Sequence, residues 1–303
     1  MEKRYIDSNP AFNYRDFMVP AYQQNVSFLS KYGDSHHRLT TIKNCRVSGV
    51  ELPPKEYTQK NTINDTKLDN NIQRARSTIV ELGFCNEWDL FVTLTISPEK
   101  HNRQALKDFK KKLNSFKKDM ERRHGVRFAY LLIPEQHQDG AWHMHGFIKG
   151  LTPENLRLMS LDEKLPYHIR DKLQNGEEVY DWPAYRQRFG YCTLEPIRNT
   201  EAATRYISKY ITKDMGRTVT ELGGHLYYAS KGLKRREVLK KGLYAGNIKP
   251  SHQGEYSSTT WFTNLGTDEI NQITNDIEKI VSSPKEWLNR QGNIELMEEC
   301  PWA

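Results

Sequence analysis

A predicted β-hairpin near the middle of the chain constrains the fold most. The apolar run Phe128-Ala-Tyr-Leu-Leu-Ile133 and the segment Trp142-His-Met-His-Gly146 flank a short polar stretch containing Asp139-Gly140, a dipeptide typical of hairpin turns. Successive side chains of a strand point to opposite faces, so the two histidines share one face. Two adjacent imidazoles on a sheet are a natural pair of metal ligands, although two unrelated surface histidines would fit the triplet equally well.

A second segment, Thr204-Arg-Tyr-Ile-Ser-Lys-Tyr-Ile-Thr-Lys213, predicts a helix with Asn199 or Thr200 as its N-cap. It contains a tandem Tyr-x-x-Lys pattern made of Tyr206, Lys209, Tyr210 and Lys213. The two tyrosines are four residues apart, so they share one face of the predicted helix. Two isoleucines form an adjacent apolar stripe that would dock the helix. Packing of the tyrosines into that stripe is the alternative interpretation.

The composition favours a globular protein with a nucleic-acid partner. The chain has 303 residues, 37% of them hydrophobic and 11% aromatic, and a mean hydropathy of -0.80. A net charge of +7 and a pI of about 9.0 favour a polyanion, nucleic acid before membrane. Four scattered cysteines without a Cys-x-x-Cys pair argue against a structural zinc site and indicate reduced thiols in the cytoplasm. Neither a signal peptide nor a membrane span is predicted.

Periodicity along the chain predicts an α+β fold. Strands are expected over 91–96, 127–134, 142–148, 191–197 and 225–229, and helices over 68–82, 103–123 and 268–281, besides the tyrosine helix. This order favours a central antiparallel β-sheet with helices packed on one face. Three parts are expected: an irregular N-terminal arm over 1–66, a domain over 67–248, and a C-terminal extension over 249–303.

Taken together, the motifs resemble those of the HUH endonuclease superfamily. Phe91-Val-Thr-Leu-Thr95, then Glu135 upstream of His143-Met-His145, then the tandem tyrosines occur in the family's order and at plausible spacing. The resemblance covers residues 88 to 235. It is greatest to the rolling-circle replication initiators (Rep proteins) of single-stranded DNA phages and related plasmids, in their two-tyrosine branch. It implies that residues 67–248 form an HUH endonuclease domain with a ferredoxin-like, RRM-like core.

The resemblance also implies a metal-dependent nickase and ligase. The metal ligands would be His143, His145 and Glu135, and the catalytic residues would be Tyr206, Tyr210, Lys209 and Lys213. Imidazoles and an oxygen ligand suit Mg²⁺ or Mn²⁺, and the bound ion would act as a Lewis acid on the scissile phosphodiester. One tyrosine would form a covalent 5′-phosphotyrosine and free a 3′-hydroxyl primer, and the second would end the round. The lysines would neutralise charge or fix the DNA backbone, because a phenol with a pKa of about 10 is a poor nucleophile.

The third metal ligand depends on the length of the hairpin loop. A strict two-residue turn at Asp139-Gly140 would place Gln136 opposite His143, whereas an odd loop or a bulge would place Glu135 there. A carboxylate binds a hard cation better than an amide does, so Glu135 is expected, with Gln136 and then His137 as alternatives. Two threonines of the upstream strand, Thr93 and Thr95, either line the site or serve only the strand.

The implied partners are single-stranded DNA at a replication origin and a host replication helicase and polymerase, in the cytoplasm of a bacterial host. A transposase or relaxase of the same superfamily is the alternative within that class. A metal-dependent nuclease that uses water would form no covalent adduct. A non-catalytic DNA-binding protein would require only the positive charge and the aromatic residues.

Overall fold

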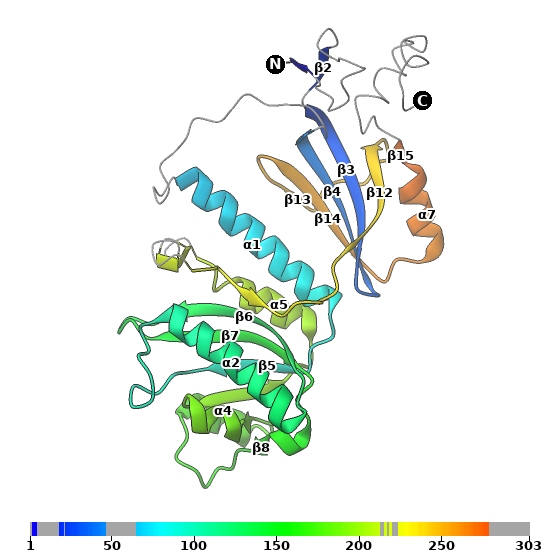
Figure 1. Ribbon diagram of the computed structural model, residues 1–303. Helices are drawn as coiled ribbons and strands as arrows, with labels where there is room; N and C mark the ends of the chain where they lie inside the picture. Colours follow the sequence, from blue (N-terminus) through cyan, green and yellow to red (C-terminus); the bar gives the residue numbers. More distant parts are fainter. Residues whose placement is uncertain are drawn as a thin grey trace. The chain divides into compact units, whose positions relative to one another are not determined.

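The computed structural model describes residues 2–4, 18–20, 22–46, 65–212, 215–216, 218–219 and 224–278. The chain divides into two compact units. The terminal unit combines Met1–Thr58 with Arg236–Ala303, and the central unit comprises Gln59–Arg235. The chain therefore begins in one unit, forms the other, and returns to the first. Each unit is described separately below (Figure 1).

The central unit contains an antiparallel seven-stranded sheet in the order β11-β6-β7-β5-β10-β9-β8. The strands are β5 (Leu90–Leu94), β6 (Ala129–Gln136), β7 (Trp142–Lys149), β8 (Arg157–Leu158), β9 (Tyr180–Asp181), β10 (Cys192–Pro196) and β11 (Tyr228–Ala229). The predicted strands are confirmed, with ends shifted by a few residues. The hairpin strands β6 and β7 lie near the middle of the sheet, where both faces are covered. This explains why β7 is almost entirely buried instead of alternating between buried and exposed residues.

The central unit also contains α1 (Asp65–Cys85), α2 (Leu106–His124), a 3₁₀ turn η2 (Pro153–Asn155), α3 (Tyr167–Gln174), α4 (Pro183–Arg188) and α5 (Thr200–Ser208). The predicted apolar stripe of α2 is confirmed, because its buried residues are Leu106, Phe109, Leu113, Phe116 and Met120. The helix ends at Gly125, whose left-handed backbone returns an N–H group to the Met120 carbonyl.

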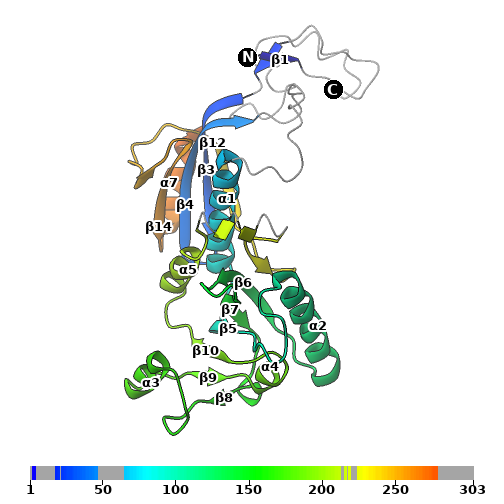
Figure 2. The same cartoon turned by 90° about the vertical axis from the view of Figure 1, so that its left-hand side faces the viewer.

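Helices cover both faces of this sheet, and the prediction that they pack on one face is wrong. On the face opposite the histidines, the Trp142 indole donates to the Gln104 carbonyl just before α2, and Phe116 of α2 contacts Trp182. On the histidine face, the rings of α5 and the turn after it contact β5 and β7. Figure 2 shows α5 and α2 on opposite sides of β6 and β7. The central strands carry large apolar side chains on both faces, so one layer of helices cannot bury them.

The terminal unit contains an antiparallel six-stranded sheet in the order β13-β14-β4-β3-β12-β15. Its elements are β3 (Tyr22–Tyr32), β4 (His36–Arg46), β12 (Glu237–Tyr244), β13 (His252–Gln253), β14 (Ser257–Thr263), α7 (Thr267–Asn275) and β15 (Ile277–Glu278), and a separate pair is formed by β1 (Glu2–Arg4) and β2 (Met18–Pro20). The core between sheet and helix is built on Leu29, Leu39, Ile273 and Ile277. The predicted helix over 268–281 is confirmed up to Asn275.

The division into units differs from the one predicted. The expected irregular arm, 1–66, contains two long strands, and residues 236–248, expected in the central domain, pair with one of them through β12. The reason is long-range pairing. The hairpin of β3 and β4 obtains its other neighbours from the far end of the chain, and its polar residues hide the strand pattern when it is considered alone. No helix in the described part of the chain is long and apolar enough to cross a membrane.

Candidate active site

The register of the hairpin places Glu135 on the histidine face. Glu135 pairs directly with His143, and Gln136 pairs with Trp142. The connection between the strands is residues 137–141, an odd number, so the odd loop is the alternative that the structure contains. The loop is held by an ion pair between Arg103 and Asp139, whose carboxylate also accepts a hydrogen bond from the backbone of the loop. The sequence alternative that places Gln136 opposite His143 is therefore excluded.

Glu135 and His145 are joined by a hydrogen bond of 2.7 Å between Oε2 and Nε2. The other imidazole nitrogen, Nδ1, lies 3.1 Å from the Thr93 hydroxyl on the neighbouring strand β5. When Nε2 carries the hydrogen, Nδ1 accepts a hydrogen bond from Thr93. His145 is only 8% exposed, so both contacts fix the ring. The hydrogen bond from His145 also holds the pKa of the Glu135 carboxyl below its usual value.

A third histidine comes from the hairpin loop. The His137 ring stacks on His143 with a centroid distance of 3.8 Å, and its Nε2 lies 3.8 Å from the Glu135 carboxylate. Burial, reinforced by the neighbouring His137, lowers the pKa of His143 to about 4. His143 is therefore neutral near pH 7. The sequence suggested His137 only as the last alternative for a metal ligand, because nothing in a loop sequence indicates that it folds back over the strand.

The chemistry of these side chains fits a hard or borderline divalent ion. Neutral imidazole nitrogens and a carboxylate are ligands that Mn²⁺ accepts, and Glu135, His143 and His145 face the same side of the sheet. In the described part of the chain, however, no group of three or more His, Cys, Asp or Glu side chains has a metal-binding arrangement. Glu135 and His145 bond to one another, and an ion would have to replace that contact. The metal site stays a prediction.

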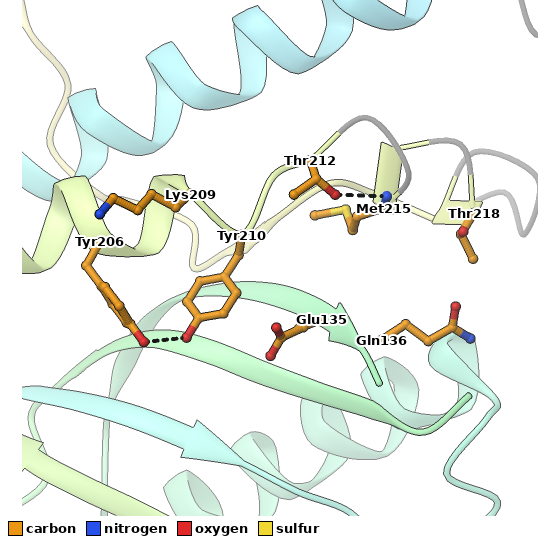
Figure 3. Close-up of a pocket in the computed structure, with 8 residues that line it drawn as sticks. All are labelled: Glu135, Gln136, Tyr206, Lys209, Tyr210, Thr212, Met215 and Thr218. Atoms are coloured by element: carbon orange, nitrogen blue, oxygen red, sulfur yellow. Dashed lines mark hydrogen bonds between the residues drawn. The ribbon is translucent and has the colours of Figure 1, made fainter. Parts of the chain in front are cut away.

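The two tyrosines meet at their hydroxyls although only one is helical. Helix α5 begins at the Asn199 N-cap, whose side chain accepts from the Ala202 N–H at 2.9 Å. It ends at Ser208, earlier than predicted, so Tyr210 lies in the turn that follows. The Tyr210 hydroxyl nevertheless donates to that of Tyr206 at 2.8 Å (Figure 3).

Each tyrosine ring also contacts the sheet. The Tyr210 ring lies parallel to His145, with centroids 4.5 Å apart and an interplanar angle of 1°. The Tyr206 ring meets Phe91 of β5 edge to face at 5.8 Å. The tyrosine segment and the histidine strand, about sixty positions apart in sequence, are therefore in direct contact. Burial, followed by the hydrogen bond with Tyr206, raises the pKa of Tyr210 above its usual value, so its phenol is neutral near pH 7.

A pocket of about 430 Å³ opens beside these hydroxyls. It is lined by Glu135, Gln136, Tyr206, Lys209, Tyr210, Thr212, Met215 and Thr218. Figure 3 shows the Lys209 ammonium directed away from the two tyrosine hydroxyls, so its predicted contribution of charge requires a different side-chain conformation. Lys213, the other predicted lysine, lies outside the described residues. Of the two threonines considered, Thr93 contacts the site, whereas the Thr95 hydroxyl donates to the Tyr191 carbonyl.

Comparison with protein families agrees with this region of the chain. Residues 89–215 match the family model for the replication-associated protein ORF2. The match supports a rolling-circle, Rep-type protein. The matched range begins just before β5 and includes both histidine and tyrosine motifs, but α1 and the terminal unit lie outside it. Comparison with curated proteins and with solved structures gave no match.

Proposed function

We propose that this protein starts rolling-circle DNA replication by nicking and rejoining single-stranded DNA through a covalent tyrosine intermediate. One observation carries the proposal. The Tyr210 ring stacks on His145, and its hydroxyl pairs with that of Tyr206, beside the carboxylate of Glu135. Two candidate nucleophiles and the side chains suited to a divalent ion therefore border one pocket, in the region that matches a replication-associated family.

The proposed reaction is a transesterification. The phenol oxygen of a tyrosine attacks the phosphorus of a DNA phosphodiester, a phosphorus–oxygen bond to the tyrosine forms, and the bond to the 3′-oxygen breaks. The leaving 3′-oxygen takes up a proton and becomes the primer hydroxyl, while the phenol loses its proton. The number of phosphodiester bonds does not change, so the covalent intermediate retains the energy for rejoining and no nucleotide triphosphate is consumed.

The chain's own residues have distinct parts in this reaction. In the described arrangement Tyr210 donates its hydrogen to Tyr206, so the Tyr206 oxygen is the first acceptor in reach. His145 is held by Glu135 and Thr93 and supports the Tyr210 ring. A divalent ion bound by Glu135, His143 and His145 would supply Lewis-acid polarisation of the phosphate. The neutral phenol of Tyr210 needs such added positive charge, because burial disfavours its anion.

The test is a covalent adduct assay on the full-length protein. The protein is incubated with an end-labelled pool of random single-stranded oligonucleotides and Mn²⁺, and the product is separated on a denaturing gel. We expect an adduct that a chelator abolishes and that the double variant Tyr206→Phe/Tyr210→Phe does not form. Tyr167→Phe is the matched control, because that tyrosine is 84% exposed on α3, and it should leave the adduct unchanged.

Two results would contradict the proposal. An adduct that persists in the double variant would show that neither tyrosine is the nucleophile. Cleavage by the wild-type protein without an adduct would identify a nuclease that uses water. Mass spectrometry of the adduct peptide then distinguishes attachment at Tyr206 from attachment at Tyr210.

A further inference from the structure

Helix α1 makes the contact that decides where Tyr210 lies, although it is outside the range that matches the replication-associated family. The Arg76 guanidinium of α1 donates two hydrogen bonds to the Ile211 carbonyl, from Nη2 at 2.6 Å and from Nε at 3.1 Å. Arg76 and Ile211 are 135 positions apart in sequence. Both donors of a rigid guanidinium fork therefore bind the backbone one residue beyond the predicted nucleophile.

The backbone at this point needs an external support. Helix α5 ends at Ser208, and the next bonds are shorter-range: Lys209 N–H to the Tyr206 carbonyl at 3.1 Å and Tyr210 N–H to the Ile207 carbonyl at 3.2 Å. The last carbonyls of a helix lack intrahelical partners and require others. The Tyr210 carbonyl accepts from the Thr212 N–H at 3.0 Å, and Arg76 serves the Ile211 carbonyl.

A second contact fixes α5 against the same helix. A Cβ atom on Gly83 of α1 would lie 2.4 Å from the Thr204 side chain, so only glycine permits this approach of the two helices. Ile207 and Ile211, on either side of the Tyr210 turn, are fully buried. The helical part that carries Tyr206 is thus held by side-chain packing. The turn that carries Tyr210 is held by packing together with the Arg76 bonds.

We infer that Arg76 is a positioning residue that holds the Tyr210 ring over His145, and that it acts on Tyr210 more than on Tyr206. This inference rests on the proposed function. Loss of the fork would free the backbone at Ile211, and the ring whose turn it supports would leave its parallel contact with His145. Tyr206 lies within α5 and keeps its own contact with Phe91. Small displacements of a reacting group cost large factors in rate, so the two tyrosines should respond differently.

The experiment compares Arg76→Gln, Arg76→Lys and the matched control Arg74→Gln in the full-length protein. Arg74 is an exposed residue of the same helix, so its replacement makes the same change in charge. Adduct formation at each tyrosine is followed in time by peptide mass spectrometry. We expect Arg76→Gln to slow attachment at Tyr210 roughly tenfold or more and to change attachment at Tyr206 less than about twofold. Arg76→Lys should restore part of the rate, because an ammonium can donate one bond to the same carbonyl.

Hydrogen exchange gives a readout that is independent of the chemistry. Amides in the peptide spanning 205–212 should exchange faster in Arg76→Gln than in Arg74→Gln. Equal exchange in the two variants, equal slowing of both tyrosines, or a wild-type adduct that never involves Tyr210 would overturn the inference. Absence of any wild-type adduct would instead refute the proposed function on which it rests, and the exchange result would still show whether Arg76 holds this turn.

Discussion

Replacement of Gly146 by alanine is expected to destabilise the central unit more than the same change at Gly125. Gly146 directly follows His145 and pairs with Leu132 of β6 and Val92 of β5. Its φ of 155° lies in a range that favours glycine, and a Cβ atom there would lie 2.0 Å from the Leu131 carbonyl oxygen. Gly125, after α2, has a φ of 67°, but nothing lies within 4 Å of its Cβ position.

The two positions separate backbone strain from steric overlap. A side chain in an unfavourable backbone conformation costs about 1–2 kcal/mol, and this is the whole cost expected for Gly125→Ala. At Gly146 the overlap with a backbone atom must also be relieved. The two strands would have to move apart by about 1 Å or more, which adds about 1–3 kcal/mol of overpacking and weakens ladder hydrogen bonds worth about 1 kcal/mol each. We therefore expect Gly146→Ala to lower the free energy of unfolding by about 3–6 kcal/mol.

Urea unfolding followed by tryptophan fluorescence measures both variants. Trp142, in the same strand as Gly146, is fully buried, so its emission should report separation of the strands. A smaller midpoint shift is expected for Gly125→Ala. If Gly146→Ala cost no more than Gly125→Ala, the close approach of β6 and β7 at this residue would be wrong, and with it the explanation of why glycine follows the second histidine.

Two further substitutions test the supports of the site. Thr93→Val keeps the shape of the side chain but removes the bond to His145 Nδ1, so we expect a loss of about 1–2 kcal/mol in the free energy of unfolding and roughly tenfold weaker Mn²⁺ binding by calorimetry. Unchanged Mn²⁺ affinity would separate Thr93 from the metal ligand. Asn199→Ala removes the N-cap of α5 and should cost about 1 kcal/mol in urea unfolding, whereas Asn199→Ser should retain most of the stability. Equal losses in the two variants would exclude capping as the reason.

Local patterns in the sequence were sufficient for elements whose burial repeats along the chain. The five buried residues of α2 recur at helical spacing, and the strands of the central sheet are short runs of apolar and β-branched residues bounded by polar ones. These signals are local because the same face of a helix or strand contacts the core along its whole length. The N-cap of α5 was also predictable, because a side chain and a backbone N–H only three residues apart make it.

The sequence alone left open the points that depend on distant partners. The extent of the terminal unit depends on β12, which is paired with β3 about two hundred residues earlier, so the predicted arm and extension could not be recognised as one sheet. The end of α5 at Ser208 was not predicted either. The chain leaves the helix where its carbonyl finds Arg76 from α1, and no pattern within the tyrosine segment indicates that partner.

The sequence by itself determined that the chain forms an antiparallel sheet with helices and that two histidines share one strand face, because adjacent residues decide those features. Only the tertiary structure decided that Glu135 stands opposite His143, that His137 folds back over the same strand, and that Tyr210 lies on His145. Loop register, stacking and hydrogen bonds to remote backbone arise when separate elements pack together. Their energies depend on contacts that do not exist until the chain has folded.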